Sequence, residues 1–513
     1  MPQIKVHEKA LAHLTRGLYR SPASAIRELI SNAWDANATT VRITTNAPNF
    51  FQLSIDDDGD GFTRQEFENL MQGGIGNSQK RPQNTELLHG RAVIGRLGIG
   101  MLGIAQICGA FIITSKTQTG AGFKARVRLY DLIKQRLDTQ DQELIQSDED
   151  GVTEVNVGQY DFLEFVPARV HKGTHILADE LHPTFVRAFQ RSVQHDAYKD
   201  PSLDWKNALR VVSTFHTLQE LGDYWRLLWE IAASCPIPYV SREALPHGLI
   251  RDDQKRLEGY EFSVLVDGLQ LFKPILLHDN PGGYTTTRIP RTTQRVYGRE
   301  IVFHGYVLVQ EGAQLHPDEL RGILIRVKDV GIGYYDASML DYRFNEGPRS
   351  RWLTGEVFVD VGLEDALNVD RDSFNRFHPE YRAIQEHVHG LLHEEIFPRV
   401  YKEIERRSTE RAKTREESRT TSLNRVMTDA LRAPVEVRFN NRPSSGDADV
   451  KIDKGPKQVR VSAPAPEEIA TKRSQRQLAS SILTVFEVAM QERTRERQRE
   501  VFKKLLLELL SRW

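Results

Sequence analysis

A row of polar residues on one predicted helix sets the strongest constraint on what this chain can fold into. The helix is predicted over residues 22–38, with a proline at its first position. Glu28, Asn32 and Asp35 stand at positions i, i+4 and i+7, so they share one face of the helix. The residues between them are largely apolar and can face a core. We therefore expect this helix to lie between a hydrophobic core and a polar surface.

The polar row suits one particular chemistry. The amide oxygen of Asn32 can ligate a Mg²⁺ ion that also holds phosphate oxygens. Glu28, one turn earlier, can orient and deprotonate an attacking water. The alternative is a polar helix face with ordinary surface contacts.

A strand and a short acidic loop follow the helix. Residues 51–56 alternate apolar and polar, and the chain then runs through Asp57, Gly59 and Gly61. The glycines let the backbone approach a ligand closely, and a carboxylate can accept the exocyclic amino group of adenine. A calcium loop is the rival interpretation, but Phe67 stands where the bidentate glutamate belongs and a strand leads in.

A glycine-rich segment precedes a second predicted helix, over residues 101–108. Gly95, Gly98 and Gly100 can expose backbone N–H groups to anions at that helix N-terminus. With Gly103, the last two also spell the dinucleotide fingerprint. No strand leads into that fingerprint, and no acidic residue follows about 20 positions later, so we disfavour it.

The order of these motifs resembles the GHKL superfamily of gyrase B, heat-shock chaperones, histidine kinases and mismatch-repair MutL proteins. The resemblance runs from about Ala25 to Lys116. It implies an ATP-binding domain of the α/β class, in which helices cover an antiparallel sheet, with ATP and Mg²⁺ as ligands. It also implies that Glu28 is the catalytic base, that Asn32 binds Mg²⁺, and that Asp35 is the acidic residue that follows in the site.

The same resemblance implies roles for the later motifs. Asp57 matches the aspartate that binds adenine, with Gly59 and Gly61 beneath the base. Thr114, in the strand expected over residues 111–115, matches a threonine that supports this aspartate and a water.

The phosphate end of the site follows from the resemblance in the same way. Gly95, Gly98 and Gly100 match the glycines that face the phosphates. Lys80 lies in the expected lid over the nucleotide, where it can contact phosphate, although the lid sequence departs from every branch of the superfamily.

A second region contributes one further candidate. Strands expected over 322–328 and 354–361 precede Leu367-Asn-Val-Asp-Arg371. This pattern resembles the middle domain of the ninety-kilodalton heat-shock chaperones, where an arginine reaches the γ-phosphate. The resemblance implies a catalytic role for Arg371. A surface arginine beside Asp370 and Asp372 is the alternative.

We interpret the chain as an ATPase with slow hydrolysis, in which ATP drives lid closure and domain rearrangement, as in a chaperone-like switch. A histidine kinase is disfavoured, since too little chain precedes residue 22 for a phosphoacceptor domain. A DNA-associated ATPase like MutL or the MORC proteins stays open, as does a nucleotide-gated subunit of a multi-protein system. The basic clusters after residue 400 alternate with glutamate and do not by themselves support nucleic-acid binding.

Composition limits the partners and the cellular location that we expect for this chain. Its 513 residues carry 69 basic and 70 acidic side chains, so charge gives no general argument for nucleic acid or membrane. No stretch approaches the ~20 apolar residues of a membrane span, and the first residues lack an apolar signal segment. We expect a cytoplasmic protein. Cys108 and Cys235 are expected to be core residues.

The expected organisation has five parts. Residues 1–195 form the ATP-binding domain, and 196–400 form a transducer-like α/β middle domain that includes helices over 205–233 and 379–407. Residues 401–432 form a charged helix, 433–466 a flexible linker, and 467–513 an amphipathic helix. The apolar stripe of that last helix predicts a homodimer or a partner protein.

Overall fold

The computed structural model describes most of the chain: residues 2–7, 22–75, 87–88, 91–92, 100–129, 145–147, 153–192, 204–241, 244–277, 283–344, 346–368, 373–431, 435–440, 451–454, 459–464, 490, 494–498, 500–501 and 504. The chain divides into two units, residues 1–400 and 401–513.

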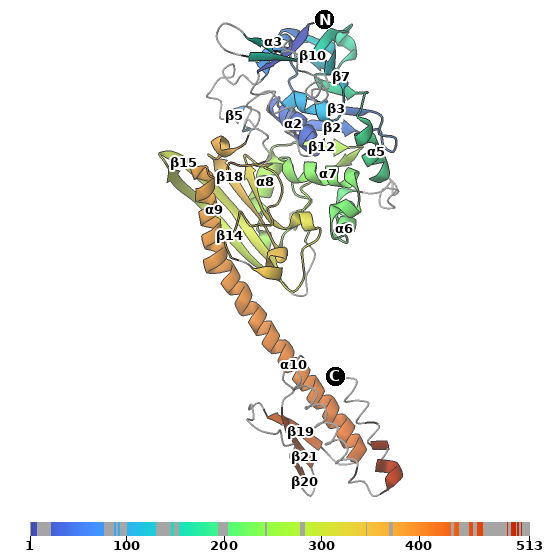
Figure 1. The fold of residues 1–513 in the computed structure, drawn as a ribbon, viewed down its shortest axis with the longest axis vertical. Coiled ribbons are helices and arrows are strands. Elements are labelled where there is room, and N and C mark those ends of the chain that lie inside the picture. The colour runs from blue at the N-terminus through green and yellow to red at the C-terminus, as the bar shows by residue number, and fades with distance from the viewer. Residues whose placement is uncertain are drawn as a thin grey trace. The chain divides into compact units, whose positions relative to one another are not determined.

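An 11-stranded sheet is the framework of the first unit (Figure 1). Its order is β13-β12-β2-β3-β11-β7-β8-β10-β1-β4, with β9 paired to β10. The strands are β1 (Gln3–His7), β2 (Thr40–Thr44), β3 (Leu53–Asp57), β4 (Gln72–Ile75), β7 (Ala110–Lys116), β8 (Gly122–Leu129), β9 (Ile145–Ser147), β10 (Thr153–Phe162), β11 (Gly173–Ala178), β12 (Ser263–Val266) and β13 (Leu269–Gln270).

One face of this sheet is apolar because alternate residues of each strand point to the same side. Ile43, Ile55, Ile176 and Ile113 lie in register across four neighbouring strands and are buried. Helices complete the same core: α2 (Pro22–Asp35), α3 (Arg64–Met71), α5 (Pro183–Ser192), α6 (Trp205–Val212) and α7 (Asp223–Ser234). The fold is therefore a mixed α/β layer structure, as predicted.

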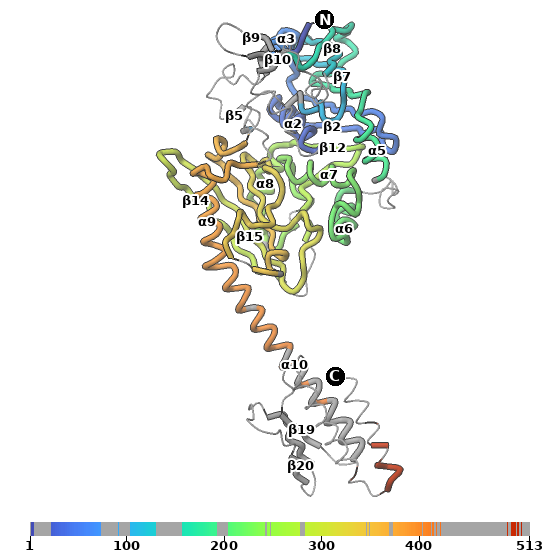
Figure 2. The backbone as a smooth tube through the Cα atoms, viewed as in Figure 1, coloured from blue at the N-terminus to red at the C-terminus, as the bar shows by residue number. Residues whose placement is uncertain are grey.

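The edge of the sheet comes from far along the chain. After α8 (Arg251–Gly259), strand β12 pairs in parallel with β2. The two labelled segments lie side by side in Figure 2. Asp267 strengthens this junction, since its carboxylate accepts from the amide and hydroxyl of Thr45 at 2.7 and 2.6 Å. Residues beyond 195 thus complete the first sheet, and the boundary at 195 stays a prediction.

A second, five-stranded sheet has the order β14-β15-β18-β16-β17. Its strands are β14 (Tyr284–Val296), β15 (Arg299–Gln310), β16 (Gly322–Val327), β17 (Val330–Gly331) and β18 (Leu353–Val361). The strands predicted over 322–328 and 354–361 are β16 and β18, which pair in parallel. Helix α9 (Pro379–Leu391) follows this sheet in the chain, and a π-helical turn, Leu392–Ile396, connects it to α10 (Phe397–Leu431).

Two predicted elements outside the candidate site differ from the structure. The helical stretch expected over 205–233 is divided into α6 and α7, which are separated by turns that include the 3₁₀ turn Leu218–Glu220 and by Gly222, with φ 93°, directly before α7. Between 433 and 466, where a linker was expected, β19 (Val435–Asn440), β21 (Val459–Pro464) and β20 (Lys451–Lys454) form a three-stranded sheet. Apolar residues alternate along β19 and β21, and this period of two outweighs the polar composition around them.

Most of the predicted C-terminal helix, 467–513, lies outside the described residues. No helix in the part of the chain that the structure describes is long and apolar enough to cross a membrane.

Candidate functional site

Helix α2 positions the first group of candidate residues. Its apolar residues are buried in the core, and Glu28 is only 7% exposed. Asn32 and Asp35, further along the same face, are half-buried. Arg27 Nη2 lies 4.0 Å from Glu28 Oε1. The predicted row of carboxylate, amide and carboxylate is therefore carried by a helix that is packed against a core.

Asp57 ends strand β3 and is the most perturbed carboxyl group of the site. Its Oδ1 accepts hydrogen bonds from the amide N–H of Gly59 at 2.9 Å and of Thr174 at 3.2 Å. Burial raises the pKa of Asp57 to about 6, although these two hydrogen bonds act in the opposite direction. The carboxyl group thus changes its protonation state near neutral pH.

The two glycines after Asp57 are required by the packing of the chain itself. A Cβ on Gly59 would lie 2.8 Å from the carbonyl oxygen of Ala36. Gly61 has φ +64°, and a Cβ there would lie 2.4 Å from the carbonyl oxygen of Lys116. The backbone of this loop therefore lies tightly against the end of α2 and the end of β7.

The loop also binds the residues that connect α2 to β2. The amide of Asp60 donates to the carbonyl oxygen of Ala36 at 2.7 Å. The carboxylate of Asp58 accepts from the amides of Thr39 and Thr40 at 2.7 and 2.9 Å. We call residues 36–40 the connector, because they follow the helix that carries Glu28 and are hydrogen-bonded to the loop that follows Asp57.

The register of the sheet corrects the prediction that Thr114 supports Asp57. Thr114 pairs with His175, which pairs with Asp56, so Thr114 lies on the face of the sheet opposite to Asp57. Thr174, on β11, is the direct register partner of Asp57.

Ser115 is the residue of β7 that lies on the correct face, as the partner of Thr174. Its Oγ lies 3.2 Å from Thr174 Oγ1 and accepts from the amide of Phe62 at 2.9 Å. The sequence signal that was overlooked is Gly173-Thr174, a glycine directly before a polar residue at the start of a strand.

The phosphate end of the site is only partly described. Lys80, Gly95 and Gly98 lie outside the described residues, and their predicted roles remain predictions. Gly100 begins a 3₁₀ helix, Gly100–Gln106, where the sequence predicted an α-helix from Met101 to Cys108. The 3₁₀ helix leads the chain into β7, as the predicted helix was expected to do.

Arg371 also lies outside the described residues, but its flanks are described. Asn368 donates from its amide N–H to the carbonyl oxygen of Ser373 at 3.0 Å, and its Nδ2 donates to Ser373 Oγ at 2.8 Å. Leu367 and Phe374 form an isolated antiparallel bridge. The residues on either side of Arg371 are therefore held together.

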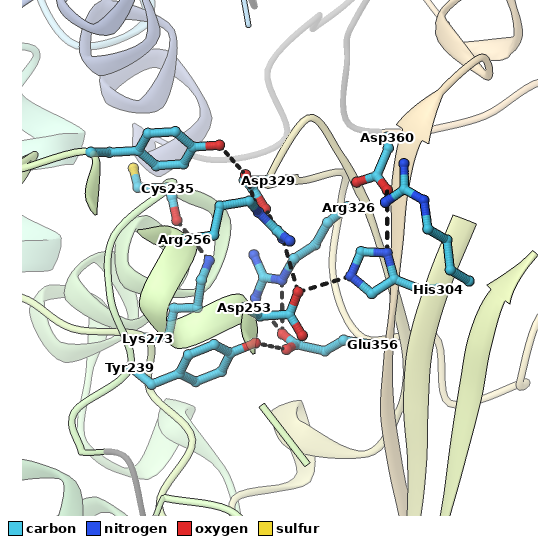
Figure 3. A network of polar contacts seen from close by, with 12 residues as sticks. Cys235, Tyr239, Asp253, Arg256, Lys273, His304, Arg326, Asp329, Glu356 and Asp360 are labelled. Carbon is cyan, nitrogen blue, oxygen red and sulfur yellow. Dashed lines mark hydrogen bonds and ion pairs between the residues drawn. The ribbon is translucent and has the colours of Figure 1, made fainter. Parts of the chain in front are cut away.

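A second polar cluster is buried where the second sheet meets the segments around α8 (Figure 3). Glu356 and Arg326, on the neighbouring strands β18 and β16, form an ion pair with both side chains fully buried. The hydroxyls of Tyr239, Tyr306 and Tyr335 all donate to Glu356. Arg326 lowers the pKa of Glu356 against the effect of burial, so the carboxylate stays ionised.

The same cluster contains a second set of charges. Asp329, in the turn between β16 and β17, accepts from Arg256 Nη2 at 2.6 Å and from the Tyr260 hydroxyl at 3.0 Å. The carboxylate of Asp253 accepts a hydrogen bond from His304 Nε2 at 2.8 Å. The sequence signal for this cluster is a charged residue inside an otherwise apolar strand, in Ile-Leu-Ile-Arg326-Val and Gly-Glu356-Val-Phe-Val.

Comparisons with known proteins found similarity to a family model, to a known protein and to solved structures. Residues 19–158 match the family model described as Histidine kinase-, DNA gyrase B-, and HSP90-like ATPase. A protein of Herpetosiphon aurantiacus named "Putative type II restriction enzyme HgiDII" is 38% identical over 94 residues, which are 18% of this chain and 15% of that protein. The match thus spans under a fifth of that relative.

Among solved structures, a crystal structure of the N-terminal domain of a DNA repair protein is 13% identical to this chain. The alignment covers 76% of this chain and 98% of that chain, with a TM-score of 0.37.

Proposed function

We propose that this chain, which carries a GHKL-type ATPase domain at residues 19–158, hydrolyses the ATP that such a domain binds and uses it to rearrange its domains. The observation that carries the proposal is the carboxyl group of Asp57, fixed by two backbone N–H groups at the end of β3. It lies beside the connector, which leads directly from α2.

Asp57 is suited to bind the adenine base. Both backbone donors bind Oδ1, and no described residue donates a hydrogen bond to Oδ2. A carboxylate is an acceptor only, so Oδ2 can receive the exocyclic amino group of adenine. Ser115 and Thr174, on the same face of the sheet, supply hydroxyls beside it.

Asn32 fits a magnesium ion that is held mainly by phosphate oxygens and water. It is half-buried on the same helix face as Glu28 and offers a single amide oxygen, a hard ligand of the kind Mg²⁺ accepts. Bound there, Mg²⁺ would neutralise phosphate charge. Glu28, one turn away and largely shielded from solvent, orients and deprotonates the attacking water.

The second sheet supplies the moving partner in this proposal. Arg371 follows β18, and its flanking residues Asn368 and Ser373 are joined by two hydrogen bonds. An arginine presented from another element to the γ-phosphate stabilises charge that develops during phosphoryl transfer. Binding of ATP then favours one arrangement of the two sheets, which is a chaperone-like switch in kind.

A DNA-associated ATPase is the second candidate, and the match to the relative named as a restriction enzyme favours it. In that case the same ATP-driven rearrangement acts on a nucleic-acid complex. ATPase activity measured with and without duplex DNA separates the two: stimulation by DNA supports the second candidate, and an unchanged rate supports the first.

Calorimetric titration with ATP and Mg²⁺ tests the adenine site. Asp57→Asn replaces the acceptor with an amide, and we expect it to abolish detectable binding. Asp56→Asn is the matched control, because Asp56 lies on the opposite face of the sheet and bonds to His175. Wild-type affinity in Asp57→Asn would show that adenine binds elsewhere.

A further inference from the structure

Arg91 is a buried arginine that binds backbone carbonyls of two distant segments at once. Its Nη1 donates to the carbonyl oxygen of Ala38 at 2.6 Å, and its Nη2 donates to that of Tyr260 at 2.5 Å. The guanidinium lies over the ring of Trp34, 4.7 Å from its centroid. The side chain is buried, so these contacts replace its solvation.

Both acceptors are carbonyl groups that need a donor. Tyr260 caps the C-terminus of α8, and Ala38 follows the C-terminus of α2, whose Ala33 carbonyl accepts from the Ala38 amide. Carbonyl groups at helix C-termini carry partial negative charge and have no partner within the helix. A guanidinium with five donors in a rigid fork can satisfy two such carbonyls together, which an ammonium group does less well.

Ala38 lies in the centre of the connector. On one side, the connector is held by Asp58 and Asp60 of the loop that follows Asp57. On the other side it is held by Arg91. The position of α2 relative to Asp57 therefore depends on a segment that Arg91 fixes.

Tyr260 extends these contacts to the second sheet. Its ring meets Trp34 edge-on at 5.0 Å, and its hydroxyl donates to Asp329 at 3.0 Å. Asp329 also binds Arg256 of α8. Tyr260 thus accepts a hydrogen bond from Arg91 through its backbone carbonyl, and its side chain contacts the turn of the second sheet.

We propose that Arg91 is a positioning residue for the nucleotide site. It holds the connector in place, and through Tyr260 it couples the nucleotide site to the second sheet. This inference rests on the proposed function, since it concerns the same ATP site. Arg91 itself contacts neither Glu28 nor Asp57 among the contacts of the described residues. Its effect on ATP is therefore indirect and follows from the geometry of Ala36–Thr40.

The test uses ATP affinity, kcat and KM of the full chain in Arg91→Met, Arg91→Lys and Tyr260→Phe. Arg64→Met is the matched control, because Arg64 also lies over an aromatic ring, that of Phe162, but stands 60% exposed on α3. We expect Arg91→Met to weaken ATP binding about tenfold, within the usual range of coupling between sites. Arg91→Lys should recover part of the loss, and Arg64→Met should bind like the wild type.

A separate variant tests the coupling between the nucleotide site and the second sheet. Tyr260→Phe removes the hydroxyl that binds Asp329 but keeps the carbonyl that binds Arg91. We expect it to weaken ATP binding, and its effect should be non-additive with that of Arg91→Met. Strict additivity, or wild-type affinity in Tyr260→Phe, would overturn the coupling.

Two outcomes separate this inference from the proposed function. If the wild type binds ATP and a folded Arg91→Met binds it equally well, the inference fails alone. If the wild type does not bind ATP, the proposed function fails. Should Arg91→Met not fold, unchanged affinity in both Arg91→Lys and Tyr260→Phe overturns the inference.

Discussion

The amide of Thr174 donates to Oδ1 of Asp57, its register partner on the neighbouring strand, at 3.2 Å. The amide of Gly59 donates to the same oxygen. Two donors from different elements therefore fix the rotation of one carboxyl group, and its second oxygen is directed by the fold rather than by a flexible side chain. Such preorganisation reduces the entropy that a ligand has to overcome on binding.

ATP affinity should depend on pH through Asp57. Because its pKa is raised to about 6, the acceptor is mostly ionised at pH 7 and mostly protonated at pH 5. We expect affinity to rise about tenfold from pH 5 to pH 7. Adenosine serves as a second ligand, because it lacks titrating phosphates. A flat profile for adenosine would contradict the assignment of this group to the base.

The same raised pKa affects stability with the opposite sign. As pH rises from the ordinary pKa of an aspartate to about 6, the unfolded state loses the Asp57 proton before the folded state does. This group therefore lowers the free energy of unfolding as pH rises through that window. Asp57→Asn should remove this part of the pH dependence in urea unfolding.

Glu28→Ala should bind ATP with nearly wild-type affinity and hydrolyse it slowly. Loss of a positioned base commonly costs ~10²–10⁴-fold in rate. Single-turnover hydrolysis measures the effect, and Glu164→Ala, at an exposed residue after β10, is the control. Wild-type turnover in Glu28→Ala would mean that another group activates the water.

Gly173→Ala should destabilise the fold and weaken ATP binding together. Gly173 has φ +115°, and a Cβ there would lie 1.9 Å from the carbonyl oxygen of Asp57. The strands β11 and β3 have to separate, at a cost of about 1–3 kcal/mol or more. Gly109→Ala is the control, since nothing lies within 4 Å of its added Cβ. Urea unfolding and ATP titration of both variants decide the matter.

Glu356→Gln should be among the most destabilising substitutions in the second sheet. It leaves the fully buried Arg326 without its counter-charge, and such a loss costs about 3–5 kcal/mol. Glu300→Gln, at an exposed residue near the start of β15, is the control. Equal unfolding free energies for the two variants would contradict a structural role for the cluster in Figure 3.

Arg371→Ala should separate ATP binding from hydrolysis. The proposed adenine and Mg²⁺ contacts lie in the first sheet and on α2, so affinity should be retained. Hydrolysis should fall, toward or below the low end of the ~10³–10⁵-fold effects seen for such arginines. Arg295→Ala, an exposed arginine of β14, should leave the rate unchanged. Equal rates in both variants would remove Arg371 from the mechanism.

The sequence alone was sufficient for elements defined by local pattern. Helix α2 and strands β3, β7, β16 and β18 follow from apolar periodicity, which each segment carries within itself. The division of the helical stretch 205–233 was missed, because the apolar residues continue through the turns between Val212 and Gly222. The pairing of β12 with β2 was also missed, since no local pattern indicates a partner so distant in the chain.

Prediction of the site was limited by register. Glu28, Asn32 and Asp35 are placed on one face by a helical period that is visible in the sequence. Thr114 was predicted from its place near a strand end, and a shift of one residue along a strand reverses the face. Arg91 carried no signal, because its acceptors are backbone carbonyls of two distant segments.

The closure of the first sheet by β12 has a consequence for how this protein is made. Thr45 and Asp267, which bind each other at this edge, are 222 positions apart. At about 5–20 residues per second, the ribosome needs on the order of ten to fifty seconds to synthesise that interval. Throughout it, β2 presents an unpaired edge to the solvent, open to pairing with other chains. The nascent chain is therefore most exposed to aggregation before β12 emerges, and slowing translation across this interval should lower the soluble yield.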